Sequence, residues 1–179
     1  MHILLVYNPC AANGRAARTL PRVRELLTAG GMDSEIVLTE APGHATRVVR
    51  VADLSRFDGV VAAGGDGTLF EVVNGYFENR GQRRPPLGVL PVGTGNDWVR
   101  THGIPRQLDD WLAMLQAGHT ILQDVGRVRY TRGGSQRERY FVNVAGMAYD
   151  AYVVRKTERY KRWMSNKLLY LLMVLRWLG

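Results

Sequence analysis

The sequence predicts an α/β protein: a doubly wound, mainly parallel sheet with helices on both faces, followed by the start of an incomplete β-rich second domain. Up to residue 120, short apolar or β-branched runs alternate with stretches of helical periodicity. This is the pattern of right-handed strand–helix–strand crossovers. After residue 120, two strand-like runs flank a Gly-Gly pair, which is typical of an antiparallel hairpin. We therefore expect two domains, residues 1–120 and residues 121–179.

Apolar runs in the first domain are predicted to form strands that are buried on both faces, as in a sheet covered on each side by helices. They are residues 3–7, 35–38, 59–63 and 87–92. In the second domain, residues 121–130 and 139–144 are predicted strands, and residues 131–135 form the turn between them.

The first two helices are predicted from apolar residues that recur on one face. The first ends at Gly30-Gly31, and Pro21 either kinks this helix or marks its true start. The second covers residues 44–54. Its predicted buried face carries Val48, Val51 and Ala52.

The later helices are predicted from caps and periodicity together. Thr68 and Glu71 have the spacing of a capping box at the start of the third helix, and Asn74-Gly75 is interpreted as its end rather than as a ligand contact. A short helix follows at residues 98–101, and a longer one leads to Gly118.

Composition favours a folded protein of a reducing compartment. The 179 residues are 46% hydrophobic, enough for a real core, and a single cysteine, Cys10, excludes an internal disulfide framework. The first residues lack the basic start of a secretory signal. The apolar run at residues 168–175 is far shorter than the roughly 20 residues that span a bilayer. We expect a cytoplasmic protein.

The charge is +8 and is concentrated near the carboxyl end. Residues 150–179 hold seven basic and two acidic side chains. Such a segment could attract phospholipid headgroups, nucleic acid or nucleotide phosphates, and a solvated helix face without a partner is the alternative. We expect a peripheral contact with an anionic membrane surface and no nucleic-acid partner.

Residues with special chemistry follow each predicted strand of the first domain. Asn8-Pro9 follows the first strand and Thr39 the second, whereas residues 64–68 follow the third and residues 93–97 the fourth. Because the carboxyl ends of parallel strands lie at one edge of a sheet, these loops should converge on a single rim, where α/β proteins bind ligands.

The strongest functional signal is the loop at residues 64–68, Gly-Gly-Asp-Gly-Thr. Glycines between a strand and a helix leave backbone N–H groups free to face an anion, and the positive end of the helix dipole adds to the attraction. Asp66 puts a negative charge into this cradle, which suits a polyphosphate that arrives with a metal ion. The loop at residues 91–97, Pro-Val-Gly-Thr-Gly-Asn-Asp, adds a second hydroxyl and carboxylate.

Several residues keep a structural alternative beside the functional one. Asp66 could stiffen a turn, Asp97 could cap the helix at residues 98–101, and Asp124 could close a strand. Arg15, Arg18 and Lys161 are candidates for a phosphate-contacting cation, although arginines on helices are usually solvated. His44 and His119 are predicted to be surface histidines without a carboxylate partner. The sequence has neither a Walker-type Gly-Lys-Ser/Thr nor a Gly-x-Gly-x-x-Gly after the first strand.

Together, Asn8-Pro9, the segment from Thr39 to Ala45, residues 64–75 and residues 91–97 resemble the catalytic region of the family of diacylglycerol kinases, bacterial lipid kinases and sphingosine kinases. The resemblance implies that ATP lies over the first domain and that Asp66, Asp97 and Asp124 are active-site residues in a network of water and Mg²⁺. It also implies nucleotide contacts from Asn8, Pro9, Thr39, Gly65, Asp66, Gly67, Thr68, Leu69, Phe70, Glu71 and Thr94.

Two departures from the family pattern bear on activity. Ala12 stands where the family usually has glycine in its Asn-Pro-x-x-Gly loop, which could shift the backbone near phosphate. The acidic residue implied to activate the lipid hydroxyl belongs to the later part of the second domain, and nothing here matches it. We therefore expect the ATP-binding portion of a lipid kinase, which binds Mg·ATP but transfers the γ-phosphate to a lipid weakly or not at all.

Two other functions stay open. One is a kinase of a soluble acceptor, such as NAD kinase, which shares a Gly-Gly-Asp-Gly-Thr turn. The other is a non-catalytic membrane-surface module, in which aromatic and basic residues of segment 155–179 lie on anionic lipid. A core helix whose covering is missing would show the same apolar stripe. That stripe comprises Leu168, Leu171, Leu172 and Leu175.

Overall fold

The structure is a computed structural model and describes residues 1–144. Residues 1–143 form one compact unit. The apolar run at residues 168–175, the basic aromatic segment at residues 155–179 and the candidate cation Lys161 lie outside the described residues. Within residues 1–144, no helix is both long enough and apolar enough to cross a membrane.

In the described part of the chain, four strands form one sheet in which every neighbouring pair is parallel. The order across the sheet is β2-β1-β3-β4. A parallel pair cannot be closed by a hairpin, so helical crossovers connect the strands. The strands are β1 (His2–Tyr7), β2 (Asp33–Leu38), β3 (Gly59–Gly64) and β4 (Leu87–Pro91).

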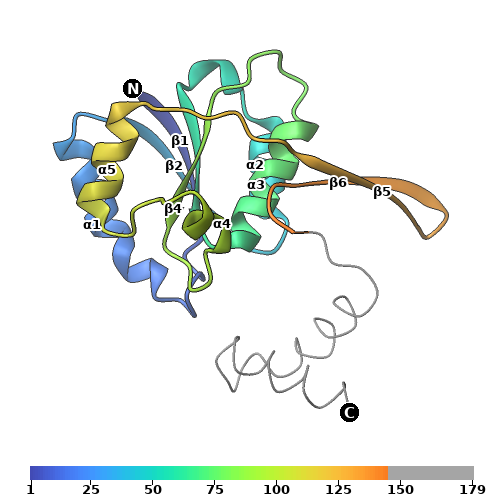
Figure 1. The fold of residues 1–179 in the computed structure, drawn as a ribbon, viewed down its shortest axis with the longest axis horizontal. Coiled ribbons are helices and arrows are strands. Elements are labelled where there is room, and N and C mark those ends of the chain that lie inside the picture. Colours follow the sequence, from blue (N-terminus) through green and yellow to red (C-terminus); the bar gives the residue numbers. More distant parts are fainter. Residues whose placement is uncertain (145–179) are drawn as a thin grey trace, which may run out of the picture. The chain divides into compact units, whose positions relative to one another are not determined.

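Helices cover both faces of this sheet (Figure 1), which confirms the doubly wound α/β prediction. α1 and α5 pack on one face, and α2 and α3 pack on the other. A short 3-10 turn, η1, precedes β3, and the short helix α4 follows β4. The bounds are α1 (Ala16–Ala29), α2 (His44–Val51), η1 (Leu54–Arg56), α3 (Asp66–Glu78), α4 (Asp97–Thr101) and α5 (Leu108–Ala117).

The core consists of two apolar layers separated by the sheet. Leu4 and Val6 of β1 belong to the layer under α2 and α3, whereas Ile3, Leu5 and Tyr7 belong to the layer under α1 and α5. Alternate residues of a strand point to opposite faces. β1 therefore contributes to both layers and is buried throughout, apart from its first residue.

The prediction of burial on both faces is wrong for β2. Glu35 and Leu38 are exposed, and Ile36 and Val37 are only half-buried. β2 is at one edge of the sheet, and its Val37 and Ile36 pack at the margins of the two core layers, so its faces are covered only in part. Its sequence, with both polar and apolar residues, fits this position.

Two predicted features of the helices also differ from the structure. α1 begins at Ala16 and contains Pro21, so Pro21 is not its start. α2 ends at Val51, and the side chains that it buries are Ala45 and Val49. Val51 was predicted to face the core but is 76% exposed, because the buried pair four residues apart fixes the helix face elsewhere.

α3 does not end at Asn74-Gly75, as predicted, but continues through both residues to Glu78. A Cβ atom on Gly75 would lie 2.5 Å from the carbonyl oxygen of Thr46 and 2.9 Å from Cβ of Val49. Gly75 therefore stands where α2 and α3 approach each other too closely for any side chain. The close packing of α2 and α3 here outweighs the tendency of the Asn-Gly pair to end a helix.

The predicted hairpin is present. β5 (Gly126–Arg132) and β6 (Ser135–Phe141) pair in antiparallel register around the turn at Gly133-Gly134, but residues 121–125 do not belong to the strand. Asn74 of α3 bonds to the β6 backbone with both ends of its amide. Its Nδ2 donates to the Tyr140 carbonyl at 2.9 Å, and its Oδ1 accepts the Tyr140 N–H at 3.0 Å. The buried Asn74 thus fixes the hairpin to the first domain.

Candidate functional site

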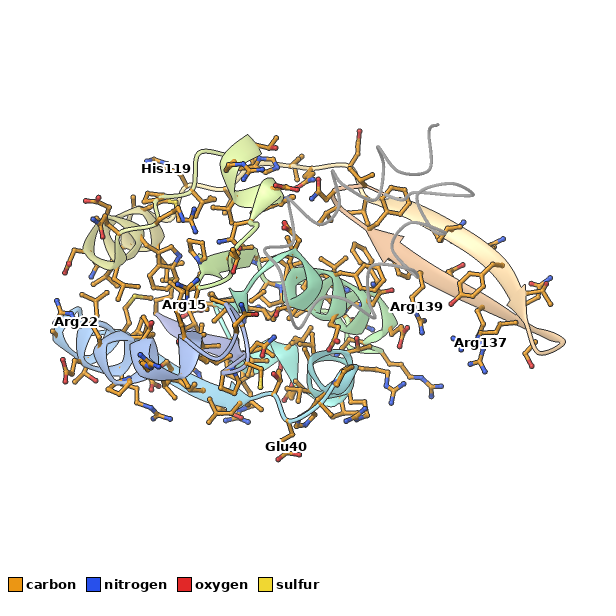
Figure 2. All side chains as sticks on the ribbon, turned by 90° about the horizontal axis from the view of Figure 1, so that it is seen from below. Arg15, Arg22, Glu40, His119, Arg137 and Arg139 are labelled. Carbon is orange, nitrogen blue, oxygen red and sulfur yellow. The ribbon has the colours of Figure 1, made fainter. Side chains whose placement is uncertain are left out.

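The loops that follow the four parallel strands lie at one edge of the sheet, as predicted. The last residues of neighbouring strands pair at the same level: Tyr7 with Leu38, Tyr7 with Ala63, and Gly64 with Pro91. Figure 2 views the molecule from the side of this edge, with Arg15 and Glu40 projecting from the loops after β1 and β2. We call this edge the rim.

Backbone hydrogen bonds join the rim loops beyond the strand ends. The Asn8 N–H donates to Ala63 at 2.9 Å, and the Thr39 N–H donates to Tyr7 at 2.8 Å. The Tyr7 hydroxyl, which is fully buried, donates to the Ala16 carbonyl at 2.6 Å and so holds the start of α1 against β1. Burial raises the pKa of Tyr7 to about 12, because the phenolate would have to form away from water.

The two glycine loops of the rim pack directly on each other. The Gly93 N–H donates to the Gly64 carbonyl at 3.0 Å, and a Cβ on Gly93 would lie 2.5 Å from Cα of Gly65. The buried Asn96 donates from Nδ2 to the Gly93 carbonyl at 2.9 Å. Within residues 1–144, Asn96 Oδ1 is the buried side-chain atom without a hydrogen-bond partner. Such acceptors are normally paired, and this one lies at the contact between the two loops, next to Gly65 and Gly93.

Asp66, the first residue of α3, links the two glycine loops. Its Oδ2 accepts the N–H of Asp97 and its Oδ1 accepts the N–H of Trp98, both at 3.1 Å. These N–H groups belong to the first turn of α4, so the Asp66 carboxylate caps that helix. Asp66 therefore has a structural role. Its carboxylate holds the neighbouring glycine loop, however, and not its own turn, as the structural alternative had assumed.

The start of α3 presents unpaired backbone donors. No acceptor within residues 1–144 takes the N–H groups of Gly65, Asp66 or Gly67, whereas those of Thr68 and Leu69 bond to the Gly65 carbonyl. A Cβ on Gly67 would meet no atom within 4 Å. A long helix thus begins with free N–H groups and open space above them, which is the geometry of an anion cradle.

Thr68 and Glu71 do not form the predicted capping box. The Thr68 hydroxyl accepts from Asn8 Nδ2 at 3.1 Å, which ties the loop after β1 to α3. Glu71 accepts the N–H groups of Gly43 and Ala45 at 2.8 and 3.2 Å, so it caps α2 instead of its own helix. Both side chains have partners on neighbouring elements, which a spacing rule within one helix does not reveal.

The other predicted nucleotide contacts lie along the same loops. Thr94 is exposed between two glycines of the second loop, and Phe70 is 42% exposed on α3. Leu69 is buried in the core, so only its backbone is available to a ligand. The Pro9 carbonyl accepts the N–H of Ala17 in the first turn of α1.

Two of the three predicted active-site aspartates are on the rim, and the third adjoins it. Asp97 is half-exposed and pairs with Arg100 in α4. Asp124 is exposed and follows Gln123, whose side chain accepts from Trp98 Nε1 at 3.0 Å and donates to the Val142 carbonyl at 2.7 Å. Within residues 1–144, no three carboxylate, imidazole or thiolate side chains lie close enough to hold a metal ion together.

The basic and histidine candidates have defined surroundings. Arg15 Nε donates to the carbonyl of Ala12 at 3.2 Å, and Ala12 has a left-handed backbone with φ of 53°, a conformation that glycine adopts more easily. His44 Nδ1 accepts the Glu40 backbone N–H at 3.1 Å and lies 3.9 Å from the Glu40 carboxylate, which is too far for a hydrogen bond. His119 is exposed (Figure 2).

Sequence reasoning missed Arg100 as a cation of the rim. Arg100 donates to the Gly95 carbonyl at 3.2 Å and to the Asp97 carboxylate. The available signal was its position three residues after Asp97 in a predicted helix, where the two side chains lie on the same face.

Comparisons with known proteins agree on one family. The sequence profile of the "Diacylglycerol kinase catalytic domain" matches residues 2–128. Diacylglycerol kinase of Bacillus subtilis (strain 168) is 37% identical over 142 residues, which are 79% of this chain and 44% of that protein. Diacylglycerol kinase of Staphylococcus aureus (strain MRSA252) is 37% identical over 141 residues, 79% of this chain and 42% of that protein. The chain thus spans less than half the length of these relatives.

A solved structure shows the same fold. The crystal structure of a diacylglycerol kinase from Bacillus anthracis str. Sterne superposes with a TM-score of 0.58 at 29% identity, covering 75% of this chain and 47% of that one. The matched family, relatives and structure all agree with the resemblance carried by the rim motifs.

Proposed function

Since the chain belongs to the diacylglycerol kinase catalytic domain family, we propose that it is the ATP-binding portion of a lipid kinase. The complete enzyme would transfer the γ-phosphate of ATP to the hydroxyl of diacylglycerol or a similar lipid. The observation that carries this proposal is the free N–H cradle at the start of α3, with Asp66 at its entrance and the second glycine loop packed against it.

The rim residues fit a nucleotide polyphosphate and its metal ion. Phosphoryl transfer requires alignment and charge neutralisation more than covalent help from the protein. The N–H groups of Gly65 and Gly67 would bind phosphate oxygens, and Thr94 would offer a hydroxyl. Asp66, Asp97 and Asp124 would hold Mg²⁺ through water, and the ion would neutralise phosphate charge when bound.

The nucleotide would extend over the loops after β1, β2 and β3. Asn8 and Pro9 border the cradle on one side, and Thr39 lies beyond them, directly after β2. Thr68, Leu69, Phe70 and Glu71 contribute the first turns of α3. For Leu69 and Glu71 we propose backbone contacts, because the Leu69 side chain is in the core and the Glu71 carboxylate caps α2.

Calorimetric titration of the 179-residue chain with ATP, with and without Mg²⁺, tests this proposal. We expect saturable binding that Mg²⁺ strengthens, and at least tenfold weaker Mg·ATP binding in Asp66→Asn. Asp33→Asn is the matched control, because Asp33 is an exposed aspartate at the start of β2, at the end of the strands opposite the rim. No binding of ATP to the wild-type chain, or equal binding by Asp66→Asn, would contradict the proposal.

The acceptor is tested by transfer of radiolabelled phosphate from ATP to diacylglycerol in mixed micelles, with NAD as the competing acceptor. We expect weak or no transfer to lipid by the 179 residues alone, because they span less than half of their relatives. A chain extended to the relatives' length should label diacylglycerol. Labelling of NAD instead would favour the soluble-acceptor kinase.

We also propose that the protein is cytoplasmic and contacts anionic membrane lipid peripherally. The hairpin β5–β6 carries five arginines and one glutamate, and Figure 2 shows Arg137 and Arg139 on it. Within the described residues, Arg132 and Arg137 make no ion pair, whereas Arg127, Arg129 and Arg139 pair with glutamates. Tyr130 and Val128 are each 37% exposed on the same hairpin. Free cations beside apolar side chains suit a negatively charged lipid surface.

Sedimentation with phosphatidylglycerol vesicles tests this contact. Arg132→Gln/Arg137→Gln should reduce pelleting severalfold, and Arg22→Gln/Arg24→Gln, which removes two exposed arginines of α1, should not. Equal pelleting by both double variants would show that the hairpin has no special role.

A further inference from the structure

Arg100 is held at the rim by contacts that a phosphate group could replace. Its guanidinium donates to the Gly95 carbonyl at 3.2 Å and to Oδ1 of Asp97. The Arg100 and Asp97 side chains are 51% and 59% exposed. Exposed ion pairs three residues apart on a helix contribute little to stability, so opening this pair costs the fold little.

The partners of Arg100 belong to the same loop that packs on the cradle. A Cβ on Gly95 would lie 3.3 Å from Asp66 Oδ2, and the Asp97 N–H is bonded to that same oxygen. Arg100 therefore reaches over residues that directly adjoin Asp66. Arg106 donates to the Gly93 carbonyl at 3.4 Å and supports the loop from the other end.

We propose that Arg100 is a phosphate-binding residue of this site and that it exchanges the Asp97 carboxylate for a phosphate oxygen when ATP binds. This inference rests on the proposed nucleotide site. An arginine–phosphate contact is charge-assisted and is frequently bidentate. Such a contact can therefore replace the exposed ion pair that Arg100 forms with one carboxylate oxygen of Asp97.

The exchange would free Asp97 for a divalent cation that accompanies ATP. The backbone of Asp97 stays fixed, because its N–H is bonded to Asp66, so only the two side chains need to rotate. The released carboxylate would then be free to help hold a divalent cation through water. Arg100 would thus keep Asp97 neutralised before binding and make it available to the metal afterwards.

The other arginines near the rim are less suited to this role. Arg15 donates to Ala12 in the loop after β1, and neither it nor Arg18 is paired with an active-site aspartate in the described residues. Phosphate binding releases the Asp97 carboxylate only if the cation that binds the phosphate is the one already paired with Asp97.

Fluorescence titration of the 179-residue chain with an ATP analogue, checked by competition with ATP and adenosine, tests the phosphate contact. Arg100→Gln should weaken ATP binding at least tenfold and leave adenosine binding within twofold, and Arg100→Lys should recover part of the loss. Arg22→Gln is the matched control, because Arg22 also forms an exposed pair with an acidic residue three positions away, Glu25. Arg22 lies on α1 (Figure 2).

The exchange is tested by a double-mutant cycle in Mg²⁺-free buffer. Asp97→Asn should tighten ATP binding at least threefold by freeing Arg100, and this gain should disappear when Arg100→Gln is present. An equal gain in both backgrounds would mean that Asp97 acts by repulsion alone and would overturn the exchange.

The outcomes separate this inference from the proposed function. If the wild-type chain binds ATP and Arg100→Gln binds it equally well, the role of Arg100 is wrong and the nucleotide site stands. If the wild-type chain binds no ATP, both fail together. Thermal unfolding of each variant identifies any that do not fold, and Arg100→Lys then provides the comparison.

Discussion

Two acidic residues of α3 each support the start of a different helix. Asp66 accepts two N–H groups at the beginning of α4, and Glu71 accepts two at the beginning of α2. The first N–H groups of a helix have no partner within it, and a carboxylate is their strongest acceptor. Residues that the family resemblance assigns to nucleotide binding therefore also position the rim.

Removing the Glu71 carboxylate should destabilise the fold. Glu71→Ala leaves the N–H groups of Gly43 and Ala45 without their acceptor, so we expect a loss of about 2 kcal/mol in the free energy of unfolding. Urea denaturation measures it. Glu25→Ala, which removes an exposed glutamate of α1 with one long contact to Arg22, should change stability by less than about 0.5 kcal/mol. Equal losses in both variants would contradict the capping role.

Tyr7 should make stability fall at high pH. Its pKa is about 12 in the folded chain against an ordinary value of 10.0, so the unfolded chain releases the proton first. The contribution of Tyr7 is complete below pH 10 and is lost as pH rises through 12, amounting to at most about 3 kcal/mol. Urea denaturation between pH 9 and pH 12 should show a steeper decline for wild type than for Tyr7→Phe. Parallel declines would mean that Tyr7 ionises equally easily in both states.

At the level of elements, periodicity predicted the strands and helices that local residues determine. Packing against residues distant in sequence determined the features that periodicity did not predict. The strands and their alternation with helices follow from apolar runs, and all four predicted strands of the sheet are present. The end of α3 at Asn74-Gly75 was predicted wrongly, because Asn74 has its partners on β6 and Gly75 has its close neighbour on α2. Those partners are distant in sequence, so no pattern within the helix could indicate them.

Two glycines of α3 should respond oppositely to the same substitution. Gly75→Ala places a methyl 2.5 Å from the Thr46 carbonyl, so we expect a loss of about 1–3 kcal/mol as α2 and α3 are forced apart. Gly67→Ala meets no neighbour and should stabilise the chain by about 0.5–1 kcal/mol. It should also weaken ATP binding, because the methyl enters the space above the cradle. Thermal unfolding and ATP titration measure the two effects, and similar stability changes would contradict this packing.

For the whole molecule, the sequence located the rim but not the connections that hold it together. The rule that parallel strands present their carboxyl ends at one edge was enough to gather Asn8, Asp66 and Thr94. The rule could not show that Asp66 caps α4 or that Arg100 pairs with Asp97, because those contacts depend on side-chain directions at a turn. The division at residue 120 remains a prediction, and the hairpin beyond it is bonded to α3 through Asn74.

Truncation at two points should reveal how far the first folding unit extends. A chain ending at residue 143 keeps both bonds between Asn74 and Tyr140 and should unfold cooperatively. A chain ending at residue 120 loses them and leaves the buried Asn74 amide without those partners, so we expect it to be less stable by about 1–3 kcal/mol. Chemical denaturation followed by circular dichroism compares them. Equal stability would support a boundary at residue 120.

The central place of β1 has a consequence for biosynthesis. Since β1 lies between β2 and β3, it leaves the ribosome before both of its neighbours and cannot complete its pairing until residue 64 has also emerged. Until then, one edge of a largely apolar segment is open to other nascent chains, a state in which aggregation competes with folding. Slow translation before β3 would prolong that exposure, and chaperones that bind extended apolar segments would act there first.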